Sequence, residues 1–146
     1  MKKIRSSKKG FTLAELLIVV AIIGVLVGIS IPIFTTQLEK SRESTDIANM
    51  RAAKAAAVSA YLGEETIGSK QLGSAQTAAV TLYYDAENGK LLDSATDITA
   101  YGKGTTATGS TTNTFMGYKY DKAAADYITV TVAADGSVTM SFNKTA

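Results

Sequence analysis

The sequence predicts an α+β fold, in which a long N-terminal helix packs through its second half on a small antiparallel sheet of three or four strands. One observation is an apolar run near the N-terminus, with no charged residue between Glu15 and Glu39. The other is a pair of alternating apolar and polar runs, 127–132 and 137–142, on either side of an Asp-Gly pair. A long apolar run favours a helix, and paired alternating runs around Asp-Gly are typical of a β-hairpin.

The apolar run is long enough to cross a membrane. Its 23 uncharged residues would span roughly 34 Å as a helix, more than the hydrocarbon thickness of a bilayer. Five cations precede it, with no acidic residue among the first ten positions: Lys2, Lys3, Arg5, Lys8 and Lys9. Because such cations are retained in the cytoplasm, we expect the C-terminal part outside. A secretory signal peptide has a shorter apolar run followed by an Ala-x-Ala site, which is missing here.

The residues at the start of this run carry a more specific pattern. Gly10 is followed directly by Phe11-Thr12-Leu13, then by Glu15, and the run closes at Pro32. In identity and spacing this resembles the signature of the type IV pilin family, which includes the pseudopilins of type II secretion. Ala14 replaces a larger aliphatic residue that the family often has, which affects packing only. The resemblance covers residues 1 to about 34 and implies a type IV pilin fold.

The resemblance implies a processing path for the N-terminus. A prepilin peptidase would cleave between Gly10 and Phe11, remove residues 1–10 as a cytoplasmic leader, and methylate the new amine of Phe11. Residues 11–34 would form a transmembrane helix that later becomes the filament core. Residues 35–146 would form an extracellular pilin domain, with the helix continuing to about residue 62 before a loop and an antiparallel sheet.

Glu15 lies inside the apolar run, where an ionised carboxylate usually implies a partner. Cleavage would create a cationic amine on Phe11, four residues away, and two such charges stabilise each other at low dielectric. We therefore expect Glu15 to pair with the Phe11 amine of its own or of a neighbouring subunit during assembly. The alternative is a carboxylate that merely lies at the lipid headgroup boundary.

Gly24, Gly28 and Pro32 make the end of the apolar run its weakest helical part. Pro32 removes one backbone donor and is expected to kink the helix. Local unwinding at these positions when subunits pack in a filament is what the resemblance implies. The alternative is simple tolerance, because glycine and proline are common in membrane helices.

Residues 35–62 read as an Ala-rich continuation of the helix. A stripe near the helical period is expected to face the sheet, and smaller residues are expected on the opposite face. Gly63 fits the position after the helix end that favours a left-handed backbone. The expected inner stripe is Ile47, Met50, Val58, Tyr61 and Leu62, and the expected outer face is Thr45, Asn49, Ala52, Ala56 and Ala60.

The remaining segments alternate between loops and strands. We expect loops over 64–74 and 102–114, a turn over 87–90, and a strand over 115–120. The stretch 75–84 favours a helical turn in its first half and a strand in its second. In the C-terminal hairpin, apolar side chains of both strands should cover the helix, while Thr129, Thr131, Thr139 and Ser141 face outward.

Composition excludes several classes of site. The chain has 15 basic and 13 acidic residues; without the leader these become 10 and 13, so a nucleic-acid role based on net charge fails. With neither cysteine nor histidine, the chain cannot form disulfides, Ser-His-Asp or Cys-His catalytic sites, or ordinary zinc sites. Asp85, Glu87 and Asn88 are spaced like partial calcium ligands, but an EF-hand needs more, and a solvated turn accounts for them.

The predicted function is structural, with no enzyme activity, cofactor or metal. The chain is expected to be a type IV pilus subunit that forms a helical homo-oligomer with minor pilins. Its expected partners are the prepilin peptidase, the assembly motor and the inner-membrane platform. It is expected to be a single-pass membrane protein before assembly and part of the cell-surface pilus afterwards.

Three other functions remain open from the sequence. The first is a pseudopilin of a secretion or DNA-uptake system. The second is an anchored, monomeric binding domain, which predicts an uncut leader and a dispensable Glu15. The third is a small secreted hydrolase, for which the sequence contains no motif.

Overall fold

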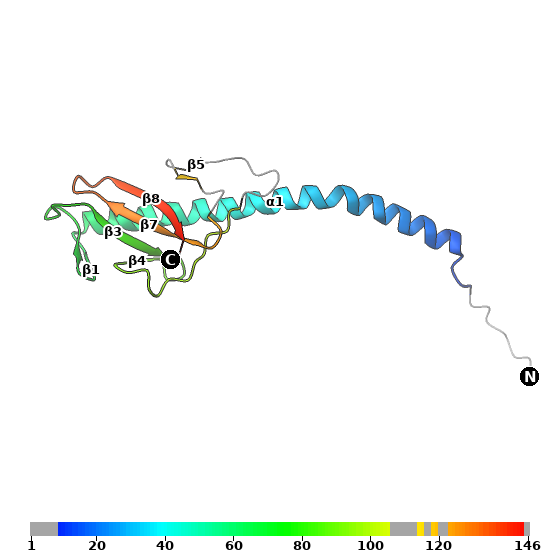
Figure 1. Cartoon of the computed structure of the whole chain (residues 1–146), viewed down its shortest axis with the longest axis horizontal. Helices are drawn as coiled ribbons and strands as arrows, with labels where there is room; N and C mark the ends of the chain where they lie inside the picture. Colours follow the sequence, from blue (N-terminus) through cyan, green and yellow to red (C-terminus); the bar gives the residue numbers. More distant parts are fainter. Residues whose placement is uncertain (1–8, 106–113, 116–117, 120–122, 145–146) are drawn as a thin grey trace, which may run out of the picture. The chain divides into compact units, whose positions relative to one another are not determined.

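A computed structural model describes residues 9–105, 114–115, 118–119 and 123–144. The chain divides into two compact units, Met1–Thr35 and Thr36–Ala146. Helix α1 (Leu13–Leu62) begins in the first unit and ends in the second, and all the strands belong to the second unit (Figure 1). The α+β class with one long N-terminal helix and an antiparallel sheet is confirmed.

In the first unit, α1 is helical without interruption through Pro32. Local hydrogen bonds accompany this part of the helix: the Ser30 hydroxyl donates to the Leu26 carbonyl at 2.7 Å, and the Thr35 hydroxyl donates to the Pro32 carbonyl at 3.0 Å. The apolar side chains here are exposed, from Phe11 at 92% to Val27 at 48%. This surface has no partner among the described residues of the chain, so packing within one chain does not explain its composition.

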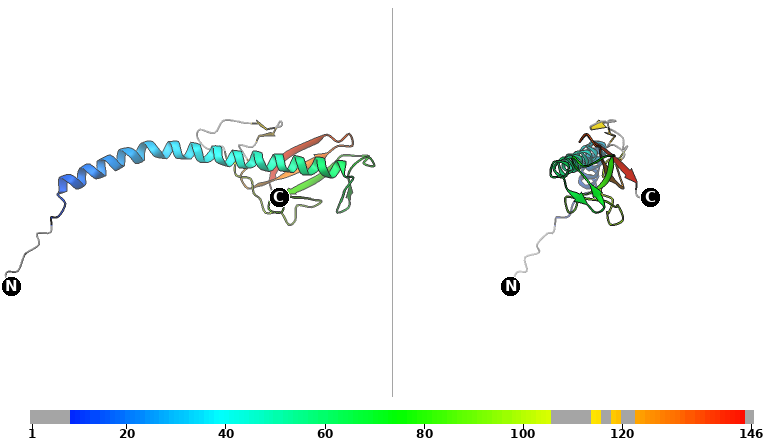
Figure 2. Two further views of the ribbon diagram at one scale, coloured as in Figure 1. Left: turned by 180° about the vertical axis from the view of Figure 1, so that it is seen from behind. Right: turned by 90° about the vertical axis from the view of Figure 1, so that its left-hand side faces the viewer.

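The second unit contains a four-stranded antiparallel sheet in the order β4-β3-β7-β8. Figure 2 shows these strands lying along the C-terminal half of α1, on one side of the helix. Their inner faces and the helix share one core cluster, which includes Met50, Leu82, Ile128 and Val130. The strands are β3 (Val80–Asp85), β4 (Lys90–Leu92), β7 (Asp126–Val132) and β8 (Val138–Lys144).

The predicted C-terminal hairpin is confirmed. Strands β7 and β8 pair in register from Asp126↔Lys144 to Val132↔Val138. In the turn, Gly136 has a φ of 81°, and its amide donates to the Ala133 carbonyl at 2.9 Å. Of the residues predicted to face outward, Thr139 is exposed and Thr131 and Ser141 are partly exposed. Thr129 does not follow the prediction, because it is only 9% exposed.

Two short hairpins depart from the predictions. The segment 64–74, expected as a loop, contains β1 (Thr66–Ile67) paired with β2 (Lys70–Gln71). Lys70 fixes this hairpin to the sheet, since its Nζ donates to the carbonyls of Thr81 and Asp93 at 2.6 and 2.8 Å.

The single strand expected over 115–120 is wrong as well. Two short strands occupy this part of the chain, β5 (Thr114–Phe115) and β6 (Tyr118–Lys119), and they pair with each other. Of that expected strand, 116–117 and 120 lie outside the described residues, as does most of the predicted loop 102–114.

The predicted inner stripe of the helix is correct in part, because Ile47 and Tyr61 are partly buried against the core cluster. Met50 is buried, but Val58 and Leu62 are 36% and 75% exposed, and Ala60, assigned to the outer face, is 3% exposed. Small residues at the true inner face allow α1 to approach the sheet closely. The buried face consists of Glu39, Glu43, Asp46, Met50, Ala53, Ala57 and Ala60.

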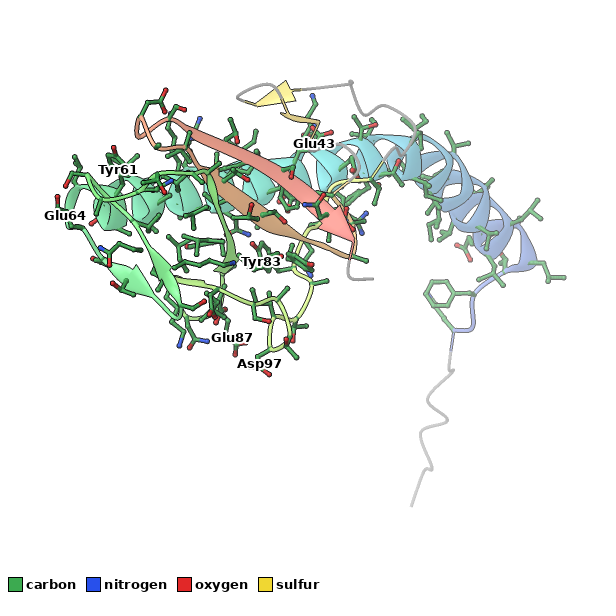
Figure 3. All side chains as sticks on the ribbon, turned by 60° about the vertical axis from the view of Figure 1, so that its left-hand side comes forward. Glu43, Tyr61, Glu64, Tyr83, Glu87 and Asp97 are labelled. Atoms are coloured by element: carbon green, nitrogen blue, oxygen red, sulfur yellow. The ribbon has the colours of Figure 1, made fainter. Side chains whose placement is uncertain are left out.

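The helix ends as predicted at Leu62, but with a different residue in the left-handed conformation. Gly63 does not have a positive φ; Glu64 does, at 51°. The amide of Glu65 donates to the Ala60 carbonyl and that of Glu64 to the Tyr61 carbonyl, the pair of bonds that defines a Schellman motif. Tyr61 and Glu64 lie at the same end of α1 (Figure 3).

Candidate functional site

The start of α1 is closed by a reciprocal cap between Thr12 and Glu15. The Thr12 amide and hydroxyl both donate to Glu15 Oε2, at 2.8 and 2.9 Å, and the Glu15 amide donates to Thr12 Oγ1 at 3.2 Å. This arrangement satisfies two backbone donors at the N-terminus of the helix, where four have no partner inside the helix. It fixes the carboxylate of Glu15 over the first turn.

The predicted cleavage residues lie immediately before this cap. Gly10 and Phe11 are exposed and precede the first helical residue, Leu13. The structure therefore places Phe11 and Glu15 within one turn of each other at the same end of the helix. Both also border the same surface hollow, together with Leu16, Ile18 and Val19.

The role of Thr12 was missed by the sequence analysis, although a signal for it exists. A Ser or Thr followed three residues later by Glu, directly before an apolar run, is the pattern of a capping box. The pattern was interpreted only as part of the cleavage signature. Its structural consequence is that one oxygen of Glu15 is already engaged, while no described residue donates to Oε1.

The structure does not bring Gly24, Gly28 and Pro32 together with Phe11 and Glu15. Gly24 follows Glu15 by nine positions, which is roughly 13 Å along a helix. A Cβ added at Gly24 or Gly28 would meet no atom within 4 Å. Neither glycine is therefore required by packing within the described chain.

A second cluster of acidic residues lies on α1 inside the C-terminal unit. Asp46 is fully buried and accepts hydrogen bonds from the Lys103 amide, at 2.9 and 3.0 Å, and from the Gly104 amide at 2.5 Å. Glu39 is 1% exposed and accepts from both the amide and the hydroxyl of Thr105, the latter at 2.7 Å. These carboxylates were missed because charge patterning places such residues on the solvent side.

Burial and hydrogen bonding act in opposite directions on these two carboxylates. For Asp46, burial dominates and raises the pKa, against the amides of Gly104 and Lys103. For Glu39, burial also acts upward, but the hydrogen bonds from Thr105 and Arg42 together outweigh it, so its pKa lies below the ordinary value. Arg42 contacts Glu39 at 3.4 Å, and Glu43 is buried on the same face.

Asp85 stabilises the turn after β3 through hydrogen bonds from Glu87 and Asn88. These bonds account for the spacing of the three residues, which resembles that of calcium ligands. Asp85 Oδ1 accepts from the amides of Glu87 and Asn88, at 3.0 and 3.2 Å, and its Oδ2 accepts from the Asn88 side chain at 2.7 Å. Glu87 and Asp97 lie on the same side of the unit (Figure 3). In the described part of the chain, no three acidic side chains are grouped as a metal ion would require.

Comparison with known proteins bears on the N-terminal site. Residues 5–31 match the family model described as "Prokaryotic N-terminal methylation motif". This range contains the predicted cleavage residues Gly10 and Phe11, the capping box, and both Gly24 and Gly28. The N-terminal segment of this chain is therefore similar to that of type IV pilins. By length and composition, α1 is also the one described helix that could cross a membrane.

Curated pilins and fimbrial proteins are similar to this chain over its N-terminal part. A "Fimbrial protein" of Pseudomonas aeruginosa is 44% identical over 64 residues, which cover 43% of this chain and 42% of the relative. A "Type IV major alpha-pilin" of Moraxella bovis is 44% identical over 59 residues, or 40% and 36%. "Fimbrial protein EcpC" of Eikenella corrodens is 33% identical over 91 residues, or 62% and 55%.

These relatives define how far the similarity extends. The chain matches between about a third and just over half of their length. No solved structure matches the chain. The type IV pilin likeness is thus carried by the processing motif and α1, and the sheet of the C-terminal unit is described from this structure alone.

Proposed function

We propose that this chain is the precursor of a type IV pilus subunit that is cleaved between Gly10 and Phe11 and polymerises through residues 11–34. The observation that supports this most is the exposed apolar surface of α1 directly after the motif. A surface of that size needs either a bilayer or other helices around it. A pilus subunit uses both, first the membrane and then the filament core. The fimbrial relatives favour this over a pseudopilin.

The cap at Thr12 supplies a specific role for Glu15. Cleavage would turn the amide nitrogen of Phe11 into an amine, which carries a positive charge next to the first turn. With Oε2 held by Thr12, Glu15 Oε1 remains for the Phe11 amine of the same chain or of a neighbour. A carboxylate fixed by its own cap loses little rotamer freedom when it pairs, which favours the pairing. Methylation of the amine keeps its charge.

The proposed partners and location follow from this role. The peptidase acts on the membrane-bound precursor, and a membrane platform with a motor extracts the processed subunit. The subunit then packs against copies of itself and against minor pilins in a filament on the cell surface. The cations before Gly10 favour a cytoplasmic leader and an outer C-terminal unit. The role is structural, so it assigns no catalytic residue.

The processing step is tested by the mass and N-terminal sequence of the chain from intact membranes. Wild type should begin at a methylated Phe11, and Gly10→Val should remain a full-length precursor. The matched control is Gly24→Val, the same substitution beyond the motif, which should be cleaved normally. A mature N-terminus at Phe11 in Gly10→Val would disprove this cleavage site.

The assembly step is tested by Glu15→Gln, which keeps the size and polarity of the side chain but removes its charge. We expect normal cleavage and few or no filaments, because an unpaired buried cation costs several kcal/mol. Glu87→Gln, an exposed carboxylate in a turn, is the control and should assemble normally. Normal filament counts by electron microscopy in Glu15→Gln would refute the pairing.

A further inference from the structure

The segment 101–104 is held from two sides in the C-terminal unit. On one side it pairs with the start of β7: the amides of Tyr101 and Gly102 donate to the Asp126 carbonyl at 3.1 and 2.9 Å. The Ala124 amide donates to the Gly104 carbonyl at 2.7 Å. On the other side lie the carboxylates of Glu39 and Asp46. Residues on the two sides of the stretch 106–122 are therefore joined by a hydrogen bond.

The three successive amides of residues 103–105 point at carboxylates of α1. Lys103 and Gly104 donate to Asp46, and Thr105 donates to Glu39. Consecutive backbone amides aimed at one anionic site form a nest, an arrangement that stabilises negative charge. The burial of Glu39 and Asp46 is thus balanced by donors from residues that are 57 to 66 positions away in sequence.

We propose that Glu39 and Asp46 act as a latch that fastens residues 103–105 to α1 and can open without unfolding of the sheet. The latch holds residues 103–105 directly, and Ala124 is connected to them by the hydrogen bond from its amide to the Gly104 carbonyl. A disulfide could serve that purpose by closing a loop, but the chain has no cysteine. The latch is a property of the C-terminal unit and does not depend on the proposed pilus role.

The latch differs from ordinary core packing in what holds it. The contacts are hydrogen bonds between backbone amides and charged groups, without an apolar side chain from 103–105 in the core cluster. In contrast, β7 is fixed by pairing on both edges and by three fully buried side chains, Ile128, Val130 and Val132. Removing a carboxylate should therefore release 103–105 and leave β7 in place.

The experiment is amide hydrogen exchange on the full-length chain in detergent micelles, residue by residue. The variants are Glu39→Gln and Asp46→Asn, and the control is Asp97→Asn, which removes one charge from an exposed loop residue. We expect the amides of 103–105 to exchange at least about tenfold faster in the two latch variants. The amides of Val130 and Val132 should be unchanged, and the control should match wild type.

A second pair of variants tests the latch from the other side with less risk to folding. Thr105→Val removes the hydroxyl that donates to Glu39 Oε2, and Thr105→Ser keeps it. We expect faster exchange at 103–105 in the valine variant and wild-type exchange in the serine variant. Unchanged exchange at 103–105 in all the latch variants would overturn the proposal. Equal acceleration at 103–105 and at Val130 would also overturn it, because the segment would then open only with the sheet.

Discussion

Glycines have different roles in the two units of this chain. In the N-terminal unit, a Cβ added at Gly24 or Gly28 would meet no atom within 4 Å. In the C-terminal unit, a Cβ at Gly102 would overlap the Ala123 carbonyl oxygen, and one at Gly136 would lie 2.8 Å from Tyr61 Cε1. Gly102 and Gly136 are therefore required by the fold of one chain, whereas no contact in the described chain requires Gly24 or Gly28.

The same contrast holds for charge. Glu15 lies at the exposed start of an apolar helix and is held by its own neighbour Thr12. Glu39 and Asp46 are buried and held by distant backbone amides. The first unit therefore exposes a carboxylate, whereas these two carboxylates of the second unit are buried and bound within the chain.

The largest expected effect is on stability, at Gly102. Gly102→Ala would force the backbone of 101–104 away from the start of β7, because the atom nearest to the new methyl is the Ala123 carbonyl oxygen rather than a movable side chain. We expect a loss of about 3 kcal/mol or more, or failure to fold. The measurement is thermal unfolding of the full-length chain in micelles. An unchanged melting temperature would show that this approach is not tight.

Gly136→Val should cost less, about 1–3 kcal/mol. Valine strongly disfavours the φ of 81°, but the nearest group is the ring of Tyr61, which can move. That ring is tied to the hairpin by a hydrogen bond from its hydroxyl to the Ala134 carbonyl at 3.0 Å. Leader cleavage should be unaffected, which separates this variant from those in the first unit. A melting temperature equal to that of wild type would contradict the turn geometry.

The sequence predicted this hairpin because its signals are local. Alternation over seven residues and an Asp-Gly turn specify strand faces and register without knowledge of the remaining fold. The same applies to the extent of α1 and to the turn at 87–90. The N-terminal methylation motif is also local, and its residues carry the resemblance to type IV pilins.

The inner face of α1 could be found only in part in this way. Its members are alanines, one methionine and three acids, so hydrophobic periodicity selects other positions. The burial of Asp46 depends on the amides of Lys103 and Gly104, which approach only in the folded chain. The residue with the left-handed backbone was also predicted wrongly. Composition favours Gly63, but the two Schellman hydrogen bonds require the positive φ at the next residue, Glu64. Strands of two residues are too short for any pattern.

A smaller effect is expected at Asp85, and it depends on pH. The hydrogen bond from the Asn88 side chain is the main cause that lowers the pKa of Asp85 in the folded chain. A lowered pKa means that the stabilisation is present above the unfolded value, near pH 4, and is lost as the pH falls through the folded value. Asp85→Asn should cost about 1 kcal/mol at pH 7 and progressively less below pH 4. A difference from wild type that stays constant between pH 7 and pH 3 would contradict this role of the charge.

The smallest effect on stability is expected at Gly28. This position tests directly whether the glycines of the first unit serve assembly rather than folding. Alanine there meets no atom and is a better helix former by about 0.5–1 kcal/mol, so the melting temperature of the C-terminal unit should not fall. If α1 unwinds between Gly24 and Pro32 during assembly, Gly28→Ala should still reduce filament number.

Gly28 is four residues before Pro32, so its carbonyl lacks the helical donor that proline cannot supply. Unwinding should begin there, and Gly24→Ala should therefore reduce filaments less than Gly28→Ala. Filament counts by electron microscopy, with cleavage checked by mass, measure both variants. Equal losses in the two would indicate close helix packing at both glycines, and normal counts in both would show that neither position is needed for assembly.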